Sequence, residues 1–143
     1  MPNIPMGFRP FLHPLHGLLL AFPVALFTFA LLTDIAYLQT AEIQWTNFSS
    51  WLIVGALLTG GMLLVWSIIL AVVAWRLAHR QPSLIYAVLI AIMWIAGLVN
   101  AFQHSQDGWS SVGVTGLILS IISAALALTA SWVAHRTIRE MAR

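Results

Sequence analysis

The polar residues that could do chemistry in this sequence lie at the edges of long apolar runs. His13 and His16 precede the first run, and Asp34 ends it. His13 and Asp34 belong to one series with a spacing of seven residues, and His16 and Pro23 belong to another. Because seven residues make nearly two helical turns, a helix would place these side chains near one stripe. We expect this stripe to face other protein, since ionisable groups avoid lipid.

A second group of polar residues ends the third apolar run. Asn100, His104 and Asp107 follow i, i+4, i+7 spacing, which places them on one face of a helix. Asp34 is expected to leave the membrane on the same side. We therefore predict an outer-face polar cluster of Asp34, Asn100, His104 and Asp107, in which the carboxylates fix the tautomer of the imidazole. Two interpretations stay open: a hydrogen-bonded cap that closes the bundle, and a proton relay, metal site or quinone-headgroup site.

Histidines also gather near the arginines, on the opposite side. The predicted inner-face histidine cluster consists of His13, His16 and His135, with His79 nearby. Two imidazoles from facing helices can ligate a haem iron, which makes haem b one candidate ligand. Contact with water or with anionic lipid headgroups is the other interpretation. The residues alone do not select between haem b, quinone and no cofactor.

The composition excludes a water-soluble globular domain. Of the 143 residues, 61% are hydrophobic and 7% are charged, whereas a soluble domain carries roughly 25% charged residues. The six basic residues are all arginines near the ends of apolar runs, a pattern that indicates membrane topology and not nucleic-acid binding. Cysteine is absent, which excludes disulfides, thiolate metal ligands and cysteine nucleophiles.

Four apolar stretches are long enough to cross a bilayer as helices. They cover about residues 16–37, 51–75, 84–103 and 112–134. Short connections join them, so we predict an all-α membrane protein: a single domain, 1–143, that forms a four-transmembrane-helix bundle with up-down-up-down topology. Asn47 or Ser49, in the polar connection before the second span, is expected to cap the helix that follows.

The arginines also predict the orientation of this bundle. All of them fall on one side of the predicted membrane: Arg9, Arg76, Arg80, Arg136, Arg139 and Arg143. The loops of the other side carry Asp34, Glu42 and Asp107 and no basic residue. The positive-inside rule therefore places both termini in the cytoplasm, with the chain in an inner membrane.

The sequence contains no nucleophile–base constellation and no glycine-rich phosphate loop. Ionisable residues are also missing from the middle of the spans, which argues against a pump or carrier. A passive conduit for protons or small solutes along the stripe from His16 to Asp34 remains an alternative. We expect no enzymatic activity, or at most the activity of a redox subunit.

Two groups of motifs resemble a known family. The run 13–16 (HPLH), followed by the run 22–26 (FPVAL) and Asp34, is similar to the start of the bacterial membrane family catalogued as domain of unknown function 2231. The runs 100–109 (NAFQHSQDGW) and 115–120 (TGLILS) resemble its second half. The run 129–136 (TASWVAHR) lacks the glycine-rich ending associated with this family.

This resemblance implies a four-helix protein of the bacterial inner membrane with no established catalytic activity. It also implies an association with periplasmic oxidoreductases and cytochromes, and hence a role as a non-catalytic anchor or assembly partner of a periplasmic oxidoreductase. The alternative is an electron-transfer subunit that binds haem b or quinone through its histidines. The expected partners are the lipid bilayer and a periplasmic or membrane redox protein, and not nucleic acid.

Overall fold

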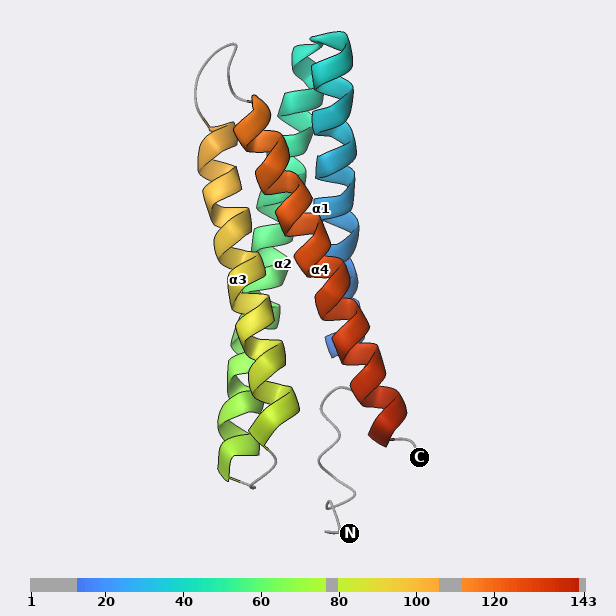
Figure 1. Ribbon diagram of the computed structural model, residues 1–143, viewed down its shortest axis with the longest axis vertical. Helices are drawn as coiled ribbons and strands as arrows, with labels where there is room; N and C mark the ends of the chain where they lie inside the picture. Colours follow the sequence, from blue (N-terminus) through green and yellow to red (C-terminus); the bar gives the residue numbers. More distant parts are fainter. Residues whose placement is uncertain (1–12, 77–79, 106–111, 142–143) are drawn as a thin grey trace.

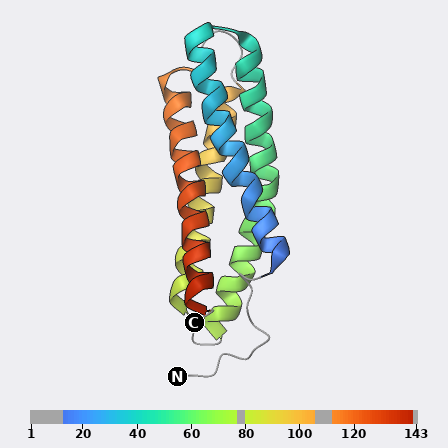
Figure 2. The same ribbon diagram turned by 90° about the vertical axis from the view of Figure 1, so that its right-hand side faces the viewer.

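Four long helices account for most of the chain in the computed structural model, which describes residues 13–76, 80–105 and 112–141. They are α1 (Pro14–Thr40), α2 (Ile43–Arg76), α3 (Arg80–His104) and α4 (Val114–Met141). Each contains a stretch that is long and apolar enough to cross a membrane. Figures 1 and 2 show the helices running alternately up and down around one core. The predicted all-α, four-helix membrane bundle is confirmed.

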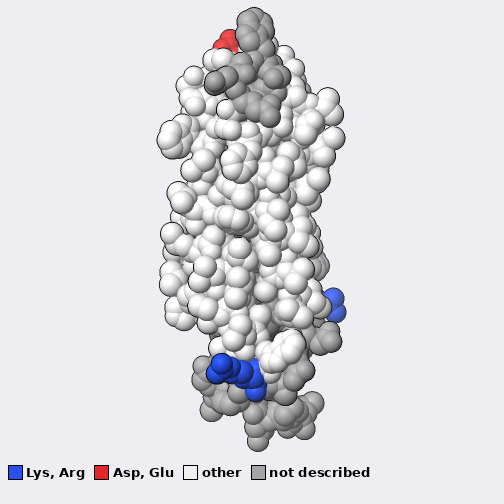
Figure 3. Space-filling view, turned by 90° about the vertical axis from the view of Figure 1, so that its left-hand side faces the viewer, with Lys and Arg blue, Asp and Glu red and all other residues white. Residues whose placement is uncertain are grey.

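Each helix packs against two others: α1 and α3 both contact α2 and α4. The two ends of the bundle differ in charge. Glu42, in the turn between α1 and α2, marks what we call the acidic end, and Arg76 and Arg136 mark the arginine end. Figure 3 shows the acidic and basic side chains towards opposite ends of a surface that is otherwise uncharged. This surface suits a bilayer, whose apolar interior excludes charge.

Buried residues recur in every helix at alternating spacings of three and four. In α1 they are His16, Leu20, Pro23, Phe27, Ala30 and Asp34. The same spacing extends from Thr46 to Leu70 in α2, from Tyr86 to His104 in α3 and from Gly116 to Ala134 in α4. A mean spacing of 3.5 residues is the pattern of knobs-into-holes packing, as in other four-helix bundles. We call these buried positions the seam of each helix.

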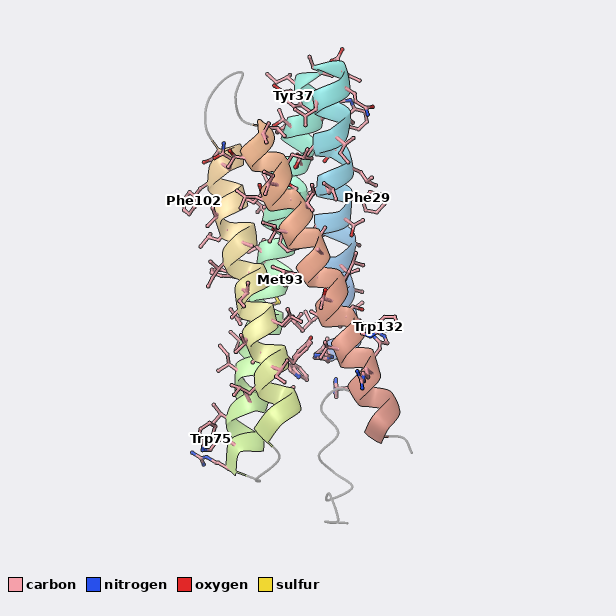
Figure 4. The ribbon with its side chains drawn as sticks, in the orientation of Figure 1. Phe29, Tyr37, Trp75, Met93, Phe102 and Trp132 are labelled. Carbon is pink, nitrogen blue, oxygen red and sulfur yellow. The ribbon has the colours of Figure 1, made fainter. Side chains whose placement is uncertain are left out.

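The outer faces of the helices are apolar and contact lipid. Phe29 is 58% exposed, Phe102 66% and Trp132 75%. Figure 4 shows these three side chains pointing away from the bundle, while Met93 lies between the helices. In lipid, burial of apolar surface does not drive helix association, so close contacts and interhelical hydrogen bonds must hold the helices together. One such bond joins α3 to α2, from Trp94 Nε1 to the carbonyl of Leu57 at 3.0 Å.

Close packing in the middle of the bundle depends on Gly97. A Cβ atom at this position would lie 2.5 Å from Cζ of Phe27 and 2.9 Å from its Cε1. The ring of Phe27 therefore occupies the space that any larger residue at 97 would need. Here α1 and α3, which lie diagonally across the bundle, touch through the core.

The turn between α1 and α2 is shorter than the sequence predicts. Ala41 ends α1 in the left-handed conformation, with φ 55°, and its N–H donates to the carbonyl of Tyr37 at 2.8 Å. Residues 43–50, expected in a connection, are helical because α2 begins at Ile43. The predicted capping role of Asn47 or Ser49 is therefore wrong, since both lie inside α2.

Candidate functional site

Five buried polar side chains form one layer of the bundle near the acidic end. They come from all four helices and have exposed fractions between 0% and 6%: Asp34, Ser49, Asn100, His104 and Ser120. Each one occupies a seam position, where an apolar residue would otherwise stand. The helix packing therefore turns them towards one another and away from lipid. We call this group the polar layer.

The imidazole of His104 lies at the centre of the polar layer. Its Nε2 atom is 2.9 Å from Oδ1 of Asp34 and 3.3 Å from Oγ of Ser49. Its Nδ1 atom is 3.0 Å from the backbone carbonyl of Asn100. Because a carbonyl oxygen only accepts hydrogen bonds, Nδ1 carries a hydrogen and donates it. The hydroxyl of Ser49 in turn donates to the carbonyl of Ala30 at 3.3 Å.

The donors and acceptors around His104 require one proton between its Nε2 atom and the Asp34 carboxyl group. With Nδ1 already protonated, the 2.9 Å contact of Nε2 with Oδ1 needs a hydrogen on one of these two atoms. The pair is then either an imidazolium with a carboxylate or a neutral imidazole with a carboxylic acid. Both arrangements have zero net charge. A neutral pair costs far less to keep away from water than an isolated ion does.

Ser120 extends the polar layer from the carboxylate to α3. Its hydroxyl donates to Oδ2 of Asp34 and accepts a hydrogen bond from Nδ2 of Asn100 at 2.8 Å. The other amide atom of Asn100, Oδ1, is buried and has no hydrogen-bond partner within the described part of the chain. A buried acceptor left without a donor costs about 1–3 kcal/mol. Oδ1 is therefore a place in the layer where a hydrogen-bond donor or a cation would be stabilised.

Three of the four residues predicted for the outer-face polar cluster meet in the polar layer: Asp34, Asn100 and His104. Asp107, the fourth, lies outside the described residues. Sequence reasoning missed Ser49 and Ser120. The signal that identifies them is their spacing, since each lies three or four residues from the next seam residue of its own helix.

A second group of buried rings lies towards the arginine end. His16 is 1% exposed, and its Nε2 atom lies 3.1 Å from the hydroxyl oxygen of Tyr86. The ring of Trp66 lies beside that of His16, with centroids 6.2 Å apart. These side chains come from α1, α3 and α2, so they link three helices near this end. Tyr86 and Trp66 were not identified from the sequence.

The members of the predicted inner-face histidine cluster differ in exposure. His16 is buried, whereas His13 and His135 are exposed. His13 caps α1, because its Nδ1 atom accepts the backbone N–H of Leu15 at 3.2 Å. Nδ1 of His135 donates to the carbonyl of Ser131 in its own helix at 2.7 Å. His79 lies outside the described residues.

These positions bear on which cofactor the histidines could hold. A haem with two axial histidines needs two imidazoles facing one enclosed space. Of the described histidines at the arginine end, one is enclosed, and its Nε2 atom is paired with Tyr86. The described histidines therefore do not fit a haem held by two imidazoles. Within the same described ranges, no group of three or more His, Asp or Glu side chains is placed to hold a metal ion.

The two groups of polar residues are separated along α1. His16 and Asp34 are 18 residues apart in the sequence, or about 27 Å along a helix. The seam residues of α1 between them are apolar and buried: Leu20, Pro23, Phe27 and Ala30. α1 thus joins two distinct sites and supplies no polar path from one to the other.

The similarity of the chain to known proteins lies at the level of a family. A model of the family described as predicted membrane protein (DUF2231) matches residues 12–138. The match extends from the start of α1 almost to the end of α4, and it includes the polar layer. Neither a search of curated proteins nor a search of solved structures found a match.

Proposed function

The chain belongs to the DUF2231 family of predicted membrane proteins, and from this premise we propose that it is a non-catalytic subunit that anchors or helps to assemble a periplasmic oxidoreductase. The observation that supports this role is the exposed apolar surface of the hairpin formed by α1 and α2. In this proposal the arginine end faces the cytoplasm, as the positive-inside rule predicts, and the hairpin faces the periplasm.

The hairpin reaches the edge of the membrane or beyond it because α2 is long. Its 34 residues span about 51 Å, whereas a bilayer with its headgroups is about 40–45 Å thick. Trp75 and Arg76 suit the headgroup region at the arginine end. The first turns of α2 then lie at the opposite headgroup region or outside it. Figure 1 shows the α1–α2 hairpin extending past the ends of α3 and α4.

Large apolar side chains are exposed on this projecting hairpin. Ile43 is 72% exposed, Phe48 54% and Leu38 47%. Trp45 lies beside Phe48, with ring centroids 6.4 Å apart. An exposed apolar patch with aromatic members is typical of a protein–protein contact. The family resemblance implies an oxidoreductase as the protein that makes this contact.

The polar layer supports an anchoring role because it binds the four helices to one another just below the hairpin. Hydrogen bonds from the side chains of Ser49, His104 and Ser120 connect each of the other three helices to α1. A surface used for docking is more effective when the elements beneath it are fixed, since less conformational freedom is lost on binding.

The proposal is tested by what co-purifies with the tagged chain after mild solubilisation of its native membrane, read by mass spectrometry and absorbance together. We expect a protein in fixed ratio that carries a haem or flavin spectrum. It should be lost from the variant with both Ile43→Ser and Phe48→Ser. The control is Trp132→Ser, which changes a residue of similar exposure, 75%, towards the arginine end.

Two outcomes contradict the proposal. One is a chain that purifies alone, or with proteins that hold no redox cofactor. The other is an intense haem band that stays with the chain after all other proteins are removed, because the chain would then carry electrons itself.

A further inference from the structure

We propose that the polar layer binds one monovalent alkali cation, in exchange for the proton shared by Asp34 and His104. Three features of the layer favour a cation: its oxygen atoms, the end of α3 and the balance of charge. The site lies within this chain and needs no partner protein, so it stands or falls independently of the anchoring role.

The oxygen atoms of the layer are those that hard cations prefer. They are the carboxylate of Asp34, the hydroxyls of Ser49 and Ser120, and the amide oxygen of Asn100, one set from each helix. Asn100 is the informative member, because it is 0% exposed and its Oδ1 has no partner among the described residues. Its Nδ2 atom is bonded to the same Ser120 hydroxyl that contacts Asp34. The amide group that carries the open oxygen is therefore joined to the carboxylate through one hydroxyl.

The end of α3 adds to the attraction for a cation. α3 ends at His104, so Asn100 and His104 both lie in its last turn. The unpaired carbonyls of a helix C-terminus carry a partial negative charge, which stabilises cations near the last turn. This field acts in the same direction as the carboxylate of Asp34.

The balance of charge selects a monovalent ion. When the shared proton leaves, His104 becomes a neutral imidazole and Asp34 remains a carboxylate, so the layer has a charge of minus one. One Na⁺ restores neutrality, whereas a divalent ion would leave a buried positive charge at high cost. The exchange is therefore one Na⁺ bound for one H⁺ released, with no change in net charge.

Among the described residues, few other titratable groups lie near the polar layer. Tyr37 lies one turn farther along α1, and Glu42 lies in the exposed turn beyond it. The described parts of α2 and α4 that pack against the layer contribute only the hydroxyl groups of Ser49 and Ser120. The pH dependence of cation binding should therefore reflect the Asp34–His104 pair itself.

The position of the layer makes it a binding site and not a passage. It lies near the acidic end, from which the ion would enter. On its other side the core is mostly apolar and is closely packed, with Phe27 lying against Gly97. An ion bound beside Asp34 would return to the aqueous phase from which it came.

The test is thermal unfolding of the purified full chain in detergent, in NaCl and in choline chloride of equal concentration. At pH 9, where protons are scarce, we expect NaCl to raise the unfolding temperature by about 3 °C or more relative to choline. At pH 6 the difference should be smaller, because a higher proton concentration competes with Na⁺ for the pair. Equal unfolding temperatures in the two salts at pH 9 would overturn the proposal.

Variants identify the site. Asn100→Leu removes the open oxygen at similar volume and should abolish the Na⁺ effect, as should Asp34→Asn, which removes the charge. Gln103→Leu changes a neighbouring residue of α3 outside the layer and should keep the effect. A Na⁺ effect that persists in Asp34→Asn contradicts the proposal.

A second measurement on the unmodified chain does not depend on whether a variant folds. Addition of NaCl to the protein in weakly buffered solution at about pH 8 should release protons, read with an indicator dye, up to one per chain. Choline chloride should release none. Equal responses to the two salts would also overturn the proposal.

Discussion

His104 connects three helices through one imidazole ring. Nε2 contacts Asp34 of α1 and Ser49 of α2, and Nδ1 is held by the Asn100 carbonyl of α3. In a region without water, removing one partner of such a pair costs more free energy than the intact pair contributes to stability. The reason is that the remaining group keeps its desolvation cost and loses the interaction that offset it. The pair is therefore expected to behave as a unit.

We predict that the destabilising effects of replacing the two members of this pair are not additive. His104→Leu leaves Asp34 with Ser120 alone, and Asp34→Leu leaves His104 without its carboxylate. Each change should lower the free energy of unfolding by about 3 kcal/mol. The double variant should lose less than the sum, with a coupling of about 1–3 kcal/mol. Reversible unfolding in mixed micelles measures all three, and strictly additive losses would refute the coupling.

Gly97 is a second residue whose substitution has a defined consequence. Gly97→Ala places a Cβ atom against the ring of Phe27, and we expect it to lower the free energy of unfolding by about 1–3 kcal/mol. Phe27→Leu in the same chain should recover part of this loss. Gly17→Ala is the matched control, because a Cβ there meets nothing within 4 Å. Unchanged stability of Gly97→Ala in a thermal unfolding experiment would show that the ring moves aside at little cost.

At the scale of the helices, polar residues interrupt an apolar seam close to its ends. The polar layer forms only when Asp34, Ser49, His104 and Ser120 lie at one level of the bundle. A slip of one helix by a turn would place Asp34 against apolar side chains and leave it unpaired. Polar residues at seam positions are known to specify register at some cost in stability, and the layer is suited to do so here.

The turn between α1 and α2 offers a test at this scale. Among the described residues, Ala41 is the non-glycine residue with a positive φ, 55°. A Cβ in the left-handed region costs about 1–2 kcal/mol. Ala41→Gly should therefore raise the free energy of unfolding by about 1 kcal/mol, and Ala41→Val should lower it. Chemical unfolding of the unmodified chain and the two variants in one detergent measures these differences. A destabilised glycine variant would contradict this account of the turn.

At the scale of the whole molecule, the orientation in the membrane is testable because the chain contains no cysteine. Glu42→Cys introduces a single thiol at the acidic end, and Arg76→Cys introduces one at the arginine end. We expect a membrane-impermeant maleimide to label the first from the periplasmic side of intact cells and the second only after the membrane is disrupted. The reverse labelling pattern would place the acidic end, and the proposed docking surface, in the cytoplasm.

Long apolar runs and their connections were sufficient to predict four antiparallel helices in a membrane, because a helix that spans lipid depends on its own sequence. The meeting of Asp34 with His104 also followed from sequence, since both end spans on the same side. The start of α2 was misplaced by eight residues. A polar stretch was interpreted as a connection, although its Ser49 is buried in the core as part of α2.

Only the tertiary structure decided which faces of α2 and α4 turn inward. These helices are apolar all round, so no amphipathic pattern marks the buried side. Rotation about each helix axis is set by packing against the neighbours. That rotation buries Ser49 and Ser120 beside Asp34, and it encloses His16 while His13 and His135 stay exposed. The types of polar residue were thus evident from the sequence, and their assembly into one layer depended on how four similar surfaces fit together.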